Sequence, residues 1–71
     1  MTTFYKGNEI FYKVKKAKTN KWMLVTFNTK TLTMNCGLVE KRPTDLGKRV
    51  SSNEWDKALL DNFEKIKFIS L

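Results

Sequence analysis

Lysine and arginine are the residues of this chain whose number and spacing point to chemistry, and that chemistry is the binding of anions. They fall into two groups. The hairpin cluster consists of Lys13, Lys15, Lys16, Lys18 and Lys21, together with Trp22. The loop cluster consists of Lys41, Arg42, Lys48 and Arg49. Lysines along a strand bind phosphates without reading a base sequence, and an aromatic ring beside them stacks on a base or wedges between base steps. The pattern therefore predicts a surface that binds nucleic acid.

Each cluster also has a second interpretation. The lysines of the hairpin cluster can serve only to keep an edge strand in solution. Tyr12 and Phe27 are typical of a core, whereas Trp22 lies beside an expected hairpin tip and is a candidate surface contact. The loop cluster contains both arginines of the chain, and guanidinium groups bind phosphate in a bidentate manner that lysine does not match. If one cluster alone binds phosphate, the loop cluster is the stronger candidate.

The positive charge is concentrated in the first part of the chain. Residues 1–50 contain eleven Lys or Arg against three acids, whereas residues 51–71 contain three Lys against four acids. A one-sided basic field in a small domain attracts polyanions, either nucleic acid or an acidic protein surface. We therefore expect both clusters to lie on one side of the molecule, opposite or beside the C-terminal helix.

The residue types on which most enzymes depend are scarce. Histidine is absent, the carboxylates are scattered and the three glycines are isolated, so no general base or phosphate-binding glycine loop is recognisable. Cys36 is the one cysteine and lies in a strand pattern, which predicts a buried structural thiol. One Cys without His excludes an internal disulfide and a structural zinc site. We expect no enzymatic activity, no cofactor and no metal.

The length of 71 residues predicts one domain, either a monomer or a weak homo-oligomer. The longest run of large apolar residues, 22–25, is far shorter than the roughly 20 residues of a membrane span. The C-terminal helix is mildly acidic, which argues against a membrane-surface role. A free thiol favours the cytoplasm, and twelve lysines against two arginines are typical of an AT-rich genome, such as that of a phage or a low-GC bacterium.

Alternating apolar and polar residues predict a sheet from about residue 3 to residue 39. Turns at 7–8, 18–20 and 28–30 separate strands expected at 4–6, 9–16, 22–27 and 31–36. The strand at 22–27 is apolar on both alternating sets, so it belongs at the centre of the sheet. Leu32, Met34 and Cys36 are expected to face inward, and Gly37 to mark a bulge or bend before residues 38–39.

The remaining residues predict a basic loop, a helix and a tail. The loop is irregular, spans 40–50 and contains the only proline, Pro43. Ser51 followed by Glu54 has the spacing of a capping box, which begins a helix at about 52 that continues to about 65. Its apolar stripe, Trp55, Leu59 and Phe63, is expected to pack on the sheet. The sheet residues expected beneath it are Tyr12, Val14, Leu24, Leu32 and Met34, or their neighbours one residue over. The tail, 66–71, completes the helix or forms a strand, and its alternation favours a strand.

Two stretches carry a resemblance to the small basic chromatin proteins of thermophilic archaea. Tyr5-Lys6-Gly7-Asn8-Glu9 is similar to their N-terminal turn, and Val50-Ser51 with Lys57, Leu59-Leu60 and Glu64-Lys65 is similar to their C-terminal helix. The resemblance implies an SH3-like barrel with a C-terminal helix, and DNA binding through a sheet face on which Trp22 and Met23 act as wedges. The chain departs from that family in its long loop with Pro43 and in Cys36, which stands where the family has glycine. The layout also resembles the three-stranded DNA-binding domains of phage-type integrases.

The sequence thus predicts an α+β fold: a small antiparallel β-meander of three to five strands, curled or partly closed in an SH3-like manner, with one C-terminal amphipathic helix. For function it predicts a small non-enzymatic basic protein that binds nucleic acid with little sequence specificity. The alternative is a protein-interaction module, such as an inhibitor or adaptor encoded by a phage or mobile element, that docks on an acidic protein surface.

Overall fold

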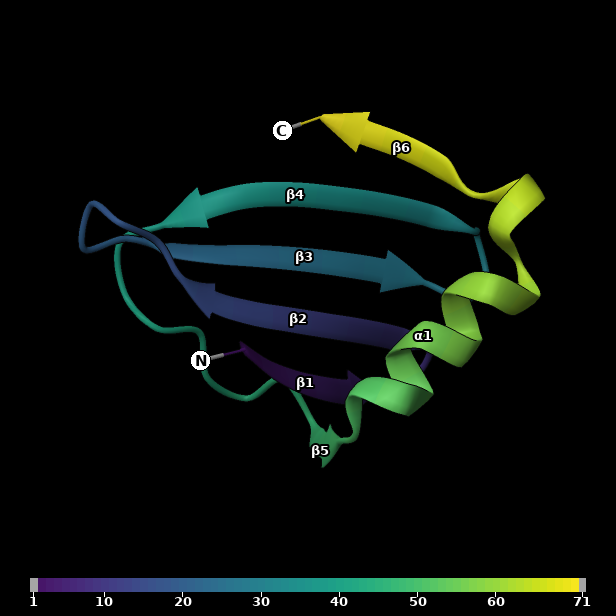
Figure 1. Ribbon diagram of the computed structural model, residues 1–71, viewed down its shortest axis with the longest axis horizontal. Helices are drawn as coiled ribbons and strands as arrows, with labels where there is room; N and C mark the ends of the chain where they lie inside the picture. Colours follow the sequence, from purple (N-terminus) through teal and green to yellow (C-terminus); the bar gives the residue numbers. More distant parts are fainter. Residues whose placement is uncertain (1, 71) are drawn as a thin grey trace.

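The computed structural model describes residues 2–70 and consists of one sheet with a single α-helix against it (Figure 1). The strands are β1 (Thr2–Gly7), β2 (Ile10–Lys16), β3 (Trp22–Asn28), β4 (Thr33–Val39), β5 (Lys48–Val50) and β6 (Lys67–Ser70). The helix α1 spans Ser52–Asp61, and a 3₁₀ turn, η1, follows at Phe63–Lys65. The α+β class and the antiparallel meander β1–β4 are confirmed, but the described sheet has six strands and not the three to five predicted, because β5 and β6 add to its edges. Leu71, the end of the predicted tail, lies outside the described residues.

The sheet is open. Its strand order is β5-β1-β2-β3-β4-β6, and every neighbouring pair is antiparallel except β4 and β6, which are parallel. The expected partial closure is therefore wrong for the described residues, and the arrangement does not confirm the SH3-like barrel. The reason lies after β4, where the chain supplies a strand to each edge instead of pairing the two edges with one another. β3 lies inside the sheet between β2 and β4, as its two apolar sets predict.

Tight turns at the expected places connect the meander. Asn8 and Asn20 adopt positive φ angles of 56° and 61°, a conformation that asparagine tolerates better than most residues. In the third turn the Oδ1 of Asn28 accepts hydrogen bonds from the backbone N–H groups of Lys30 and Thr31. Leu32 ends that turn with a φ of 58°, so β4 begins at Thr33, two residues later than predicted.

Strand register defines two faces of the sheet, because residues paired across neighbouring strands lie on the same side. The helix face carries Phe4, Phe11, Val25, Phe27 and Met34, and α1 packs on it. The loop face is the opposite side. It carries Tyr5 and Tyr12 from β1 and β2, Trp22, Leu24 and Thr26 from β3, and Asn35, Gly37 and Val39 from β4. Pairing is continuous through Gly37, which lies opposite Leu24, so the expected bulge is absent.

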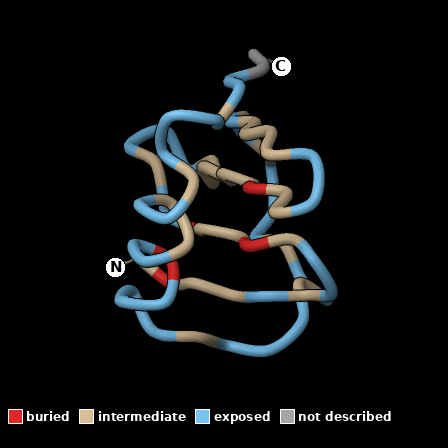
Figure 2. Tube along the Cα trace, turned by 90° about the vertical axis from the view of Figure 1, so that its right-hand side faces the viewer, coloured by how far each residue is buried: buried red, intermediate tan, exposed pale blue. Residues whose placement is uncertain are grey.

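The core lies between the helix face and α1. Phe27 is fully buried, and Phe11 and Trp55 are nearly so, with the ring of Trp55 edge-on to that of Phe11. Phe11 and Val25 pack in this core in place of Tyr12 and Leu24. They are the alternatives, one residue over, that the sequence pattern allowed. Short stretches of the chain are buried and the rest is half-buried or exposed (Figure 2).

The helix begins as predicted but ends earlier. The Oγ of Ser51 accepts a hydrogen bond from the backbone N–H of Glu54, which is the Ser51 half of the capping box. α1 ends at Asp61, and the change to a 3₁₀ turn rotates Phe63 out of the apolar stripe. Phe63 is 71% exposed, so the prediction that it packs on the sheet is wrong, whereas Leu59 does pack against the core. The tail forms β6, as its alternation favours.

Candidate functional site

The strands contain seven Lys or Arg residues and no Asp or Glu. All acidic residues of the chain lie in turns, in the 40–47 loop, or in the helical segment. A sheet surface with this composition presents positive charge and hydrogen-bond donors without a carboxylate to neutralise them. Both faces of the described sheet are therefore basic.

Alternation along β2 divides the hairpin cluster between the two faces. Lys13 and Lys15 lie on the helix face, because they pair with Val25 and Met23. Lys16 pairs with Trp22, and both lie on the loop face. Trp22 and Met23 consequently point to opposite sides, so they cannot enter the same groove as the pair of wedges that the resemblance implies. The structure does not bring the whole cluster to one side.

The loop cluster is divided as well. Arg42 and Arg49 belong to the loop face, because Arg42 contacts Trp22 and Arg49 pairs with Tyr5. Lys48 lies on the helix face, because it pairs with Lys6, which pairs in turn with Phe11. Lys41 is exposed and lies in the loop beside Glu40. The expected loop at 40–50 is also shorter than predicted, because Lys48–Val50 forms the edge strand β5.

The tip of the β2–β3 hairpin lies beside the start of the 40–47 loop. The Nζ of Lys21 is 3.6 Å from a carboxylate oxygen of Glu40, and both side chains are substantially exposed. An exposed ion pair of this kind contributes little stability. Lys18 is exposed at the same tip. Lys18, Lys21 and Lys41 thus form a basic end of the molecule next to Trp22.

The 40–47 loop crosses the loop face, and Arg42 fastens it there. The guanidinium of Arg42 lies 5.1 Å from the centre of the Trp22 ring. Its Nη2 donates a hydrogen bond of 3.0 Å to the hydroxyl of Tyr5. We call Trp22, Arg42 and Tyr5 the arginine clasp. It joins β3, the loop and β1, so Tyr5 contacts Arg42 through its hydroxyl and pairs with Arg49 of β5.

Gly47 brings the loop close to β1 at its far end. Its φ is +96°, and a Cβ at this position would lie 2.4 Å from the carbonyl oxygen of Lys6. Only glycine permits both the backbone angle and this approach. On the loop face, the paired residues Thr3 and Val14 are buried.

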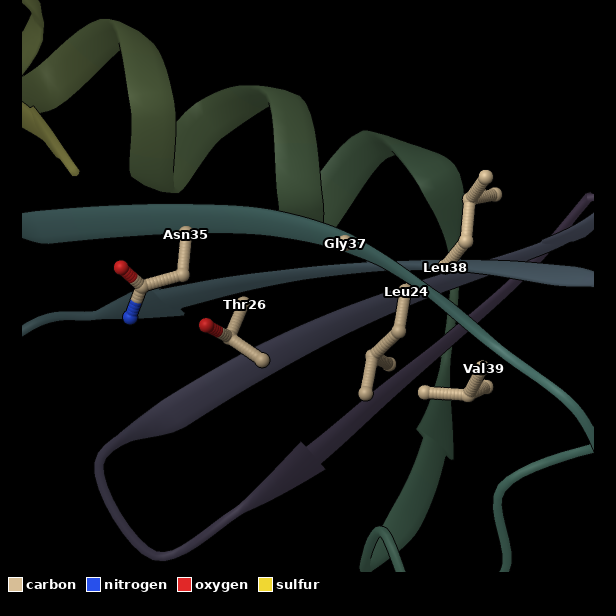
Figure 3. Close-up of a pocket in the computed structure, with 6 residues that line it drawn as sticks. All are labelled: Leu24, Thr26, Asn35, Gly37, Leu38 and Val39. Atoms are coloured by element: carbon tan, nitrogen blue, oxygen red, sulfur yellow. The ribbon is translucent and has the colours of Figure 1, made fainter. Parts of the chain in front are cut away.

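Where the loop leaves the loop face open, β3 and β4 form a hollow of about 280 Å³. Leu24, Thr26, Asn35, Gly37 and Val39 line it with side chains or, at Gly37, with bare backbone (Figure 3). The Oδ1 of Asn35 is buried and has no hydrogen-bond partner among the described residues. An unpaired buried acceptor costs roughly 1–3 kcal/mol. Sequence reasoning missed this site, although Asn35 and Gly37 are both residues that strands disfavour.

Cys36 is exposed, so the prediction of a buried thiol is wrong. It does lie on the helix face, in register with Val25, but the ten-residue α1 covers the other end of that face. Within residues 2–70 no group of three or more His, Cys, Asp or Glu side chains is placed to hold a metal ion. None of the described helices is long and apolar enough to cross a membrane.

No protein-family model, curated protein or solved structure matches the chain.

Proposed function

We propose that this chain is a small non-enzymatic protein that binds nucleic acid, with little sequence specificity, through its loop face. The arginine clasp is the observation that carries the proposal. It holds a guanidinium against the half-buried Trp22, which pairs with Lys16, and against Tyr5, which pairs with Arg49, on strands that lack any carboxylate. Cations along a strand bind phosphates, and a partly exposed aromatic ring beside them provides a surface for a base.

The affinity of such an interface depends steeply on salt, because each phosphate that meets a cation releases counterions. For duplex DNA the slope of log K against log salt is about −0.9 for each phosphate neutralised. Fluorescence polarisation with duplex DNA, single-stranded DNA and RNA at several salt concentrations measures this slope directly. Binding that ignores salt would contradict the proposal.

Two double variants locate the binding face, because they remove the same charge from opposite sides of the sheet. Lys16→Gln with Arg49→Gln neutralises the loop face, and Lys13→Gln with Lys15→Gln neutralises the helix face. We expect the first pair to weaken binding and to flatten the salt slope by roughly two units on duplex DNA. The second pair should change the slope little. Equal effects of the two pairs would mean that general charge attraction, and not the loop face, accounts for binding.

A second candidate function is docking on an acidic protein surface, and the helix face favours it. Beyond the end of α1, Leu38 is 58% exposed and pairs with Met23, which pairs in turn with Lys15. An exposed apolar row that ends in a lysine suits a protein partner with an apolar centre and an acidic rim. Weak, sequence-independent binding to every nucleic acid, together with loss of partner binding in Leu38→Asp, would favour this function.

A further inference from the structure

The hollow on the loop face exists because of Gly37. On β3, Leu24 lies opposite Gly37. Asn35 and Val39 lie before and after Gly37 on the same face of β4, and Gly37 has no side chain to fill the space beside them. The side chain of Leu38 points to the other side of the sheet (Figure 3). Glycine weakens a strand interior, and it marks places where another molecule approaches the backbone closely. Strand pairing is continuous through Gly37, so a bulge does not explain why this position is a glycine.

Two polar groups lie among the apolar walls of the hollow. Thr26 and Asn35 pair across β3 and β4, and their side chains point to the same side of the sheet as Leu24 (Figure 3). The amide oxygen of Asn35 has no donor among the described residues. Because the last torsion of an asparagine side chain is broad, the amide can turn this oxygen toward a donor in the hollow. Apolar walls with a few polar groups are the usual composition of a small-ligand site.

Positive charge and an aromatic ring lie at one end of the hollow. Val39 pairs with Trp22, and Trp22 pairs with Lys16 and contacts Arg42. A ligand in the hollow therefore lies beside groups that attract a phosphate. A volume of about 280 Å³ lies just below the range of roughly 300–1,000 Å³ that is usual for ligand pockets, so it suits one flat ring system and not a larger ligand.

We infer that the hollow receives a single unpaired base of a single-stranded nucleic acid, with its backbone held by Arg42 and Lys16. This inference rests on the proposed function and deepens it by naming the form of nucleic acid. The base lies over the bare backbone of Gly37, against Leu24 and Val39, and an N–H group on its edge donates to the Oδ1 of Asn35. A duplex cannot make this contact, because its bases are stacked and their pairing edges are occupied. Recognition of unstacked bases by their edges is common among proteins that bind single strands.

The first experiment fills the hollow. Gly37→Val adds a side chain on the loop face, and valine favours strands, so the variant should fold at least as well. Cys36→Val is the matched control, because the neighbouring residue faces the opposite side of the sheet. We expect Gly37→Val to weaken binding of a short single-stranded oligonucleotide about tenfold and Cys36→Val to leave it unchanged. The salt slope should stay the same in both variants.

The second experiment removes the bases from the ligand while keeping its phosphates. An abasic oligonucleotide of the same length has the same charge but nothing to enter the hollow. The protein should bind it about tenfold more weakly than the intact strand, and Gly37→Val should bind the two strands equally. Asn35→Leu, which removes the amide at similar size, should reduce the preference for the intact strand.

The outcomes separate the two proposals. Salt-dependent binding that is equal for intact and abasic strands, and unaffected by Gly37→Val, would refute the base-binding hollow while leaving the proposed function in place. Binding to none of the nucleic acids would refute both. A preference for intact strands that survives Gly37→Val would assign base contact to Trp22 and overturn the inference.

Discussion

Arg42→Ala should loosen the 40–47 loop and destabilise the whole protein. The substitution removes the cation–π contact with Trp22, which is worth about 0.5–1 kcal/mol at an exposed site. It also removes the hydrogen bond to the Tyr5 hydroxyl, which is worth about 0.5–1.5 kcal/mol. The expected loss is therefore about 1–2.5 kcal/mol. A domain of this length has a total stability of roughly 4–10 kcal/mol, so the loss is a substantial part of it.

Urea unfolding followed by circular dichroism measures the free energy of unfolding of each variant. Arg42→Lys keeps the charge but loses the planar group, and it should lose most of the stability that Arg42→Ala loses. A double-mutant cycle with Tyr5→Phe isolates the hydrogen bond, and a coupling of about 0.5–1 kcal/mol is expected. If Arg42→Ala changed the stability by less than about 0.3 kcal/mol, the clasp would not hold the loop, and the reasoning would be refuted.

Three further tests concern the core, the loop and the exposed thiol. Phe27→Ala should cost about 3–5 kcal/mol in urea unfolding, because Phe27 is fully buried, whereas Phe63→Ala should stay within about 0.5 kcal/mol; equal losses would contradict the packing. Gly47→Ala should lower the stability by at least about 1–3 kcal/mol, because its Cβ meets the Lys6 carbonyl, and an unchanged melting temperature would disprove that contact. Cys36 should react with a thiol reagent in the folded protein as fast as in urea, and Cys36→Ser should be neutral in stability; a protected thiol would show that the residue is covered.

Local patterns predicted the local structure well. The alternation in β2, the apolar run of β3, the turns after Gly7 and Ala17, and the Ser51 cap depend on neighbouring residues alone, and each was confirmed. The wrong predictions concern burial, that is, which side chains the helix covers. Cys36 was assigned to the correct face, but its burial depended on the length of α1, which no local pattern fixes. The prediction that Phe63 packs on the sheet was wrong because the helix changes to a 3₁₀ turn after Asp61.

The candidate site was harder to predict because it is built from distant segments. Arg42 reaches Tyr5 across 37 residues of sequence, and nothing in the composition of the loop indicates that contact. The hollow depends on the absence of a side chain at Gly37, which a search for reactive residues does not detect. Lys13 and Lys16 are both basic, but the alternation of β2 sends them to opposite sides.

The course of the chain after β4 affects how the protein folds. Residues 40–70 cross the loop face, add β5 at one edge, lay α1 on the helix face and add β6 at the other edge, so they encircle the meander (Figure 1). The meander consists of local hairpins, which form quickly, whereas the encircling segment makes contacts between residues far apart in sequence, which form late. Until that segment closes, Phe11 and Phe27 are uncovered and the edges of β1 and β4 are free to pair with other chains. During synthesis, the meander therefore emerges from the ribosome first, with an uncovered apolar face and free strand edges, and residues 40–70 emerge last. Slower packing of residues 40–70 on the meander leaves more time for newly made protein to aggregate.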